Sequence, residues 1–224
     1  MADYAPPTLA DLWALVGRDL TDPSNKVFNT SQLTDYINGG IAELNRVRPL
    51  EATYTVTWDD ENDQLPLEGI PLYSVFQVEL RAAYGGANSI VPNIKGGQPT
   101  RDGWDFYNGT LFLGSQWFQR AVHSARDNGW TVEVWGYRSR DPLIADDDLA
   151  EFIDLTDEMF VRLYSRMEAY RSLNVDRSLF QQWQQQANNS DVSPTQLNGM
   201  LGTAESSFDR QQKRLFLPRR VPAY

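Results

Sequence analysis

The side chains best suited to acid–base or metal chemistry are scarce in this sequence. It contains no cysteine and a single histidine, His123. Disulfides and thiolate chemistry are therefore excluded, and a zinc site, which usually needs several Cys or His ligands, is not expected. A Ser-His-Asp hydrolase would depend on His123 alone, in the polar stretch 120–128 with no nucleophile-elbow motif nearby. We predict that His123 is an exposed loop histidine.

Carboxylates are abundant, and the first cluster of them has a spacing that faintly resembles a calcium loop. An EF-hand loop needs glycine at its sixth position and glutamate at its twelfth, where this chain has Gln64 and Ile70. The calcium interpretation therefore fails, and we predict the solvated tip of a hairpin. The cluster consists of Asp59, Asp60, Glu61 and Asp63.

A second and denser acidic run admits two interpretations. It is either a solvated linker and helix start or an acidic surface that faces DNA or a basic partner. Its members are Asp146, Asp147, Asp148, Glu151, Asp154, Asp157 and Glu158.

Other patterns that could support chemistry are weak. With 30 acidic residues, the sequence nominates no particular carboxylate pair for glycoside hydrolysis, which requires a defined separation. The glycine pairs at 85–86 and 96–97 lack the lysine pattern of a phosphate-binding loop. Four tryptophans could stack on carbohydrate, but such residues more often form the core of a sheet. They are Trp104, Trp117, Trp130 and Trp135.

The overall composition is that of a folded, acidic protein. Hydrophobic residues make up 41% of the 224 positions, enough for a substantial core, and the formal net charge is −10. A protein that grips DNA normally presents a basic face, whereas a wall that DNA slides past can be acidic. Residues 1–8 do not resemble a signal peptide, and no stretch approaches the length of a membrane span. We expect a protein that is made, and kept or assembled, in the cytosol.

Hydrophobic spacing predicts two helices at the N-terminal end. Thr8 is a candidate N-cap with Asp11 three residues later, and an apolar stripe with helical spacing runs from Leu9 to Leu20. A second stripe begins near Thr30 and stops at Pro49. The pair at 39–40, two glycines within this helix, would permit the close approach of another helix.

The period then changes from 3.6 to 2, which predicts an antiparallel β unit over residues 53–137. Alternating segments lie at 53–58, 75–82 and 130–137. In the second, Phe76 and Val78 are expected on the same face. Asn108-Gly109 between two short apolar runs is a strong hairpin signal.

Helical spacing returns after Asp146. A long stripe runs from Phe160 to Leu173, and a shorter helix follows Asp176. The segment Ser193-Pro194-Thr195-Gln196 has the form of a capping box with proline at the first helical position. The helix that follows is expected to end before Pro218.

This order of elements predicts an α+β fold. The first and last helices cannot bury their apolar stripes alone, so we expect them to form one bundle with the β unit inserted between them. The expected domains are a helical bundle of residues 1–50 and 146–216, an inserted antiparallel β domain of residues 51–145, and an extended C-terminal arm of residues 217–224.

Several stretches resemble the head-to-tail adaptor, or connector, proteins of tailed bacteriophages. A tyrosine-rich helix after an acidic linker, residues 158–172, is similar to the third helix of that family, and the inserted β unit resembles that of tail-tubular or gatekeeper-type adaptors. The opening stretch, 9–49, carries an amphipathic helix, a loop ending at Phe28, and then Tyr36-Ile37-Asn38, Glu43-Leu44 and Arg48-Pro49.

The resemblance implies a structural virion protein of the neck, without catalytic activity or cofactor. It implies a homo-oligomeric ring, commonly a dodecamer, that binds beneath the portal, contacts the next neck or tail protein and leads DNA into the tail without binding it specifically. No membrane is involved. We expect the protein at the head–tail interface of the virion, assembled in the host cytoplasm.

Two sets of residues are candidates for these contacts. The last part of the chain is apolar and basic, with prolines that favour an extended conformation, and the adaptors that it resembles reach the portal with their C-terminal arms. We expect a portal-docking arm of Arg214, Leu215, Phe216, Leu217, Arg219, Arg220, Val221 and Tyr224. The channel lining is expected to be acidic, with candidates Asp59, Asp60, Glu61, Asp63, Asp146, Asp147 and Asp148.

Two other functions stay open. A carbohydrate- or receptor-binding module of a virion would expose the aromatic residues of the β unit. A glycoside hydrolase would have an activity that disappears when one carboxylate is changed.

Overall fold

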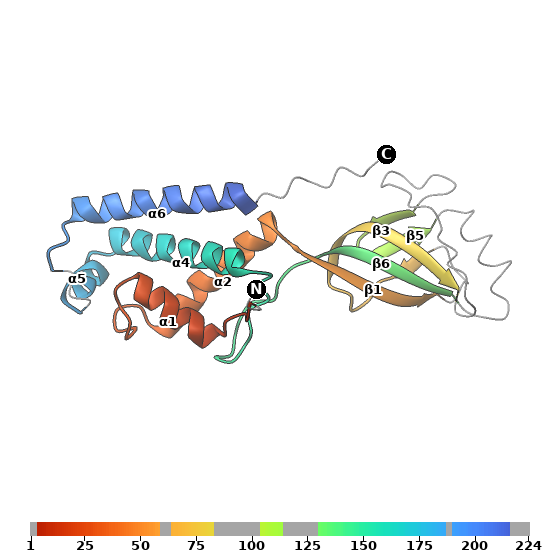
Figure 1. The fold of residues 1–224 in the computed structure, drawn as a ribbon, viewed down its shortest axis with the longest axis horizontal. Helices are drawn as coiled ribbons and strands as arrows, with labels where there is room; N and C mark the ends of the chain where they lie inside the picture. The colour runs from red at the N-terminus through yellow and green to blue at the C-terminus, as the bar shows by residue number, and fades with distance from the viewer. Residues whose placement is uncertain (1–3, 59–63, 83–103, 114–129, 187–189, 216–224) are drawn as a thin grey trace. The chain divides into compact units, whose positions relative to one another are not determined.

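The computed structural model describes residues 4–58, 64–82, 104–113, 130–186 and 190–215. The chain divides into two compact units (Figure 1). Among the described residues, the helical unit contains those up to Arg48 and those from Arg140 to Leu215, and the β unit contains those from Pro49 to Ser139. Residues 140–145, assigned to the β domain in the sequence-based boundaries, pack with the helices here. The predicted α+β class, with helices on either side of an inserted β unit, is confirmed.

The helical unit is built around one central helix. This is α4 (Leu155–Val175), which packs against α1 (Leu9–Asp19), α2 (Thr30–Val47), α5 (Arg177–Gln186) and α6 (Pro194–Leu215). Figure 1 shows α6 on one side of α4 and α1 on the other. The apolar stripes predicted from helical spacing meet in a single core around α4, which includes Leu12, Phe28, Ile37, Phe160, Trp183 and Phe208.

The helix starts follow the predicted capping chemistry. Thr8 and Asp11 form a reciprocal capping box at α1, and Ser193 and Gln196 do the same at α6. The cap of α2 is Asn29, whose side chain accepts a hydrogen bond from the Gln32 amide at 2.9 Å. Because each cap satisfies amides that the first turn leaves without partners, the helices begin at defined residues.

The glycine pair in α2 marks the closest helix contact of the unit. A Cβ atom on Gly40 would lie 3.2 Å from the backbone of Val161 in α4, and one on Gly39 would lie 3.0 Å from the Tyr164 ring. Glycine at both positions allows α2 and α4 to approach at backbone distance. The helix propensity lost at 39–40 is therefore offset by packing.

The described residues of the β unit form two three-stranded antiparallel sheets. The first has the order β1-β6-β3, formed by β1 (Leu50–Trp58), β6 (Trp130–Arg138) and β3 (Leu72–Ala82). The second has the order β2-β5-β4, formed by β2 (Gln64–Pro66), β5 (Thr110–Leu113) and β4 (Trp104–Tyr107).

The predicted hairpin turn lies between β4 and β5, where Asn108 and Gly109 both have positive φ angles of 50° and 75°. This double positive φ matches the twist of the two flanking strands, so the hairpin prediction is confirmed.

One expectation for the sheet is wrong. Phe76 and Val78 do not share a face, because the pairing of β3 with β6 shifts between Val75 and Gln77. The bulge leaves Phe76 as an extra residue that packs against Tyr137 with ring centroids 4.9 Å apart, while Val78 is fully buried.

Candidate functional site

The acidic segment before α4 is the part of the predicted site that the structure describes. The Asp148 carboxylate accepts hydrogen bonds from the amides of Ile144 and Ala145 at 2.6 and 2.7 Å. These two donors hold the pKa of the Asp148 carboxyl below its ordinary value. Asp148 therefore closes a local turn. Asp146 and Asp147, in contrast, present exposed side chains.

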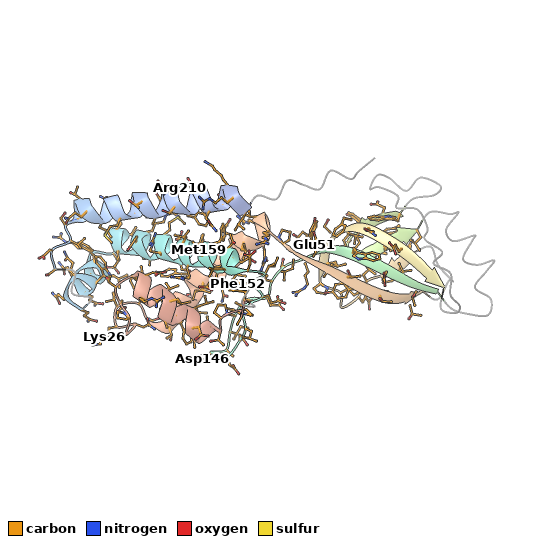
Figure 2. All side chains as sticks on the ribbon, in the orientation of Figure 1. Lys26, Glu51, Asp146, Phe152, Met159 and Arg210 are labelled. Carbon is orange, nitrogen blue, oxygen red and sulfur yellow. The ribbon has the colours of Figure 1, made fainter. Side chains whose placement is uncertain are left out.

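The backbone of this acidic segment is fixed against the start of α1. The amides of Leu9 and Ala10 donate to the carbonyls of Asp148 and Asp146, each at 3.0 Å. Farther along α2, Asn38 forms two hydrogen bonds with the backbone of Leu143, at 2.9 and 3.0 Å. Figure 2 shows Asp146 on this loop. The exposed carboxylates thus project from a rigid loop.

The same segment carries most of the exposed apolar surface of the helical unit. The exposed fractions of Ile144 and Leu149 are 81% and 61%. Leu155 and Met159 lie one turn apart on α4, so they share a face. Met159 is labelled in Figure 2. Because large exposed apolar side chains concentrated in one segment are typical of protein–protein contacts, this segment is a candidate assembly surface. We call it the 144–159 surface, after Ile144, Leu149, Ile153, Leu155 and Met159.

The remaining acids of the run have structural roles. Asp154 caps α4 by accepting from the amides of Thr156 and Asp157. Glu158 accepts from the Tyr4 hydroxyl at 3.3 Å and from Arg162 at 3.2 Å. Arg162 also binds Asp19 at 2.8 Å. The Glu158 and Arg162 interactions join α1 to α4, and two carboxylates of the predicted acidic run, Asp154 and Glu158, therefore have structural partners.

A buried cluster of two arginines and one aspartate lies where the chain leaves and re-enters the helical unit. Asp157 binds Arg140 at 3.0 Å and Arg48 at 2.9 Å, and the side chains of Arg140 and Asp157 are 1% and 0% exposed. Arg140 also donates to the carbonyls of Arg48 and Glu151. One carboxylate therefore holds both ends of the connection to the β unit.

The pKa values of the two arginines in this cluster shift in opposite directions. Burial lowers the pKa of Arg140, although the Asp157 carboxylate opposes the shift. At Arg48 burial acts in the same direction, but Asp157 and Asp154 outweigh it and raise the pKa. Since an arginine stays protonated in proteins, both guanidinium groups remain cations that need the buried carboxylate.

This cluster is not among the sequence-based predictions, because Asp157 is interpreted there as part of an acidic run that is either a solvated linker and helix start or an acidic surface. A usable signal was present: Arg48 stands at the exit from the helices, and Arg140 precedes the acidic run at the return. Their convergence on Asp157 depends on a fold that joins residues about a hundred positions apart.

A groove between α4 and α6 lies on the other side of the helical unit. Its volume is about 670 Å³, and its walls include Arg166, Tyr170, Val192, Met200 and Thr203. Among the described residues, the buried Nε atom of Arg166 has no hydrogen-bond partner. The residue as a whole is only partly buried, so it contributes a cation to the lining of the groove.

Of the other predicted site residues, the structure describes only two. Arg214 and Leu215 are the last residues of α6, and Leu215 is buried in the helical core. The rest of the predicted arm (Phe216, Leu217, Arg219, Arg220, Val221 and Tyr224) lies outside the described residues, as do Asp59, Asp60, Glu61, Asp63 and His123.

Two further features are absent from the part of the chain that the structure describes, namely a cluster of metal ligands and a membrane-spanning helix. Within the ranges given above, no three Cys, His, Asp or Glu side chains gather as metal ligands would. None of the helices in those ranges is long and apolar enough to cross a membrane. Trp104 is 4% exposed and belongs to the core of the β unit. It therefore cannot belong to an exposed carbohydrate-stacking face.

Comparison with known proteins identifies the family. No curated protein matches the chain. The family model described as SU10 adaptor protein matches residues 7–211, which span both the helices and the inserted β unit. The resemblance to phage head-to-tail adaptors seen in the sequence is therefore confirmed, and the chain belongs to the SU10 adaptor protein family.

Proposed function

We propose that this phage adaptor forms a homo-oligomeric ring beneath the portal, joins the capsid to the tail and lines the channel through which DNA passes. The observation that carries the proposal is the family match over residues 7–211. Its partners would be further copies of itself, the portal and the next neck or tail protein. The protein would reside at the head–tail junction of the virion after assembly in the host cytoplasm.

The charge of the chain supports a channel that does not retain DNA. The net charge of the chain is −10. A basic wall would hold DNA through many phosphate contacts, whereas an acidic wall would let it pass. A lumen lined mainly by lysine and arginine would contradict this part of the proposal.

The C-terminal arm is proposed as the portal-docking element. Residues 210–224 carry five basic residues and no acidic ones, together with several apolar side chains after α6. Basic groups would orient the arm on an acidic portal surface and raise the association rate, while the apolar side chains would supply affinity. Because Leu215 is a core residue, the arm is taken to start at Phe216.

Electron microscopy of the purified protein, alone and mixed with portal, tests this function. We expect closed rings on the portal, and discrete rings or monomers without it, since ring closure makes weak contacts cooperative. Failure to bind portal at any protein concentration would refute the proposal. Glycan-array binding without portal binding would favour the carbohydrate- or receptor-binding alternative.

A further inference from the structure

The 144–159 surface and the α4–α6 groove have properties that match each other. At the loop end of the surface, Ile144 and Leu149 are exposed beside the exposed carboxylates of Asp146 and Asp147. The groove offers apolar walls, from Val192 and Met200 among others. It is also lined by Arg166, whose side chain is only partly buried and carries a positive charge. The loop therefore supplies apolar groups and hydrogen-bond acceptors, and the groove supplies apolar walls and a hydrogen-bond donor.

The loop is organised before any contact is made. The Asp148 carboxylate closes the turn by accepting hydrogen bonds from two amides of the loop. The carbonyls of Asp146 and Asp148 accept hydrogen bonds from the first amides of α1. An ordered loop loses little conformational entropy when it is buried against another protein. The exposed side chains are therefore already held in position.

The two surfaces lie on different sides of the helical unit. The loop is bonded to the first residues of α1, whereas α6 forms one wall of the groove, and Figure 1 shows α1 and α6 on opposite sides of α4. One molecule cannot bring its own loop into its own groove. A contact between them must join two molecules, and it is heterologous because different surfaces meet.

We propose that residues 144–149 of one copy dock into the α4–α6 groove of the next copy, with Asp146 or Asp147 accepting from Arg166. Repetition of this contact builds the ring, so the inference rests on the proposed function and specifies how its subunits meet. The occupant of the groove is a second copy of this chain.

Cross-linking between introduced cysteines tests the contact. The chain has no cysteine of its own, so no other thiol can react. Ala145 and Thr203 are exposed, and replacing them leaves the apolar and charged groups of both surfaces intact. The double variant Ala145→Cys/Thr203→Cys, treated with a short bis-maleimide alone and on portal, is expected to give a ladder of covalent multimers. Each single variant is expected to stay monomeric on a denaturing gel. The control pair Gln181→Cys/Thr203→Cys, with Gln181 exposed on α5, should give no ladder.

Charge reversal tests the polar part of the contact. Asp146→Lys/Asp147→Lys in the cross-linking variant should reduce the ladder about tenfold, and Arg166→Glu added to it should restore the ladder. Absence of rescue would overturn the proposed pairing with Arg166.

The outcomes separate this contact from the function. Rings on the portal without a ladder would show that the subunits meet elsewhere, while the adaptor function stands. Covalent dimers from Ala145→Cys alone would indicate an isologous contact and overturn the proposal. If no oligomer forms under any condition, both the contact and the ring fail.

Discussion

At the scale of single residues, Asp157 is the group on which the helical unit depends most. It is fully buried and serves two arginines, one at each end of the connection to the β unit. The attraction between buried charges compensates for the free energy of removing them from water only while every partner is present. Removal of the carboxylate would leave the buried Arg140 without its carboxylate partner, and it would leave the partly buried Arg48 with Asp154 alone.

Asp157→Asn should therefore lower the free energy of unfolding by about 3–5 kcal/mol. Urea denaturation followed by circular dichroism measures the change. The matched control is Asp147→Asn, the same replacement at an exposed position, which should change stability by less than about 0.5 kcal/mol. Equal effects of the two variants would show that the buried cluster does not stabilise the fold.

A second prediction at this scale concerns the stability of the folded protein at acidic pH. Asp148 has a lowered pKa in the folded protein because it accepts two amide hydrogen bonds. The unfolded chain then binds a proton more readily, so this contribution to stability is present above about pH 4 and is lost as pH falls through the folded pKa. The urea midpoint of the wild type should fall between about pH 4 and 3 more steeply than that of Asp148→Asn. Parallel curves would contradict this role of Asp148.

At the scale of elements, α2 and α4 are positioned by glycine. Gly40→Ala would place a methyl group 3.2 Å from the backbone of Val161, which cannot move without shifting α4. We expect a loss of about 1–3 kcal/mol, measured by thermal or urea unfolding.

The control for Gly40→Ala is Gly202→Ala on α6, where a Cβ atom would meet nothing within 4 Å. Alanine has the higher helix propensity, so this variant should gain about 0.5–1 kcal/mol. A loss of stability at Gly40 together with a gain at Gly202 would show that packing, and not helix propensity, decides the effect at Gly40. A loss of stability at both positions would contradict the packing argument.

The helices and strands were largely predictable from the sequence, because hydrophobic spacing and helix capping depend on residues that are close together along the chain. Thr8, Ser193 and the Asn108-Gly109 turn each act within a few residues, and the structure has them as expected. The bulge at Phe76 depends on pairing with β6, which no local pattern encodes. The cluster around Asp157 depends in the same way on distant segments meeting.

At the scale of the whole molecule, we expect the proposed arm to be separable from the fold. Leu215 is buried in the helical core, so the informative truncation is after Leu215. The shortened protein should unfold at the same urea concentration as the full chain and lose binding to the portal, measured by co-sedimentation. Undiminished portal binding would assign the docking to another surface.

The central claim is that this SU10-family adaptor forms a ring between head and tail. The most direct test is an electron cryo-microscopy reconstruction of the head–tail junction of the virion. We predict a closed ring of this chain immediately beneath the portal, with its channel around the DNA path. A reconstruction with only one or two copies, or with the chain placed away from the portal, would contradict the account.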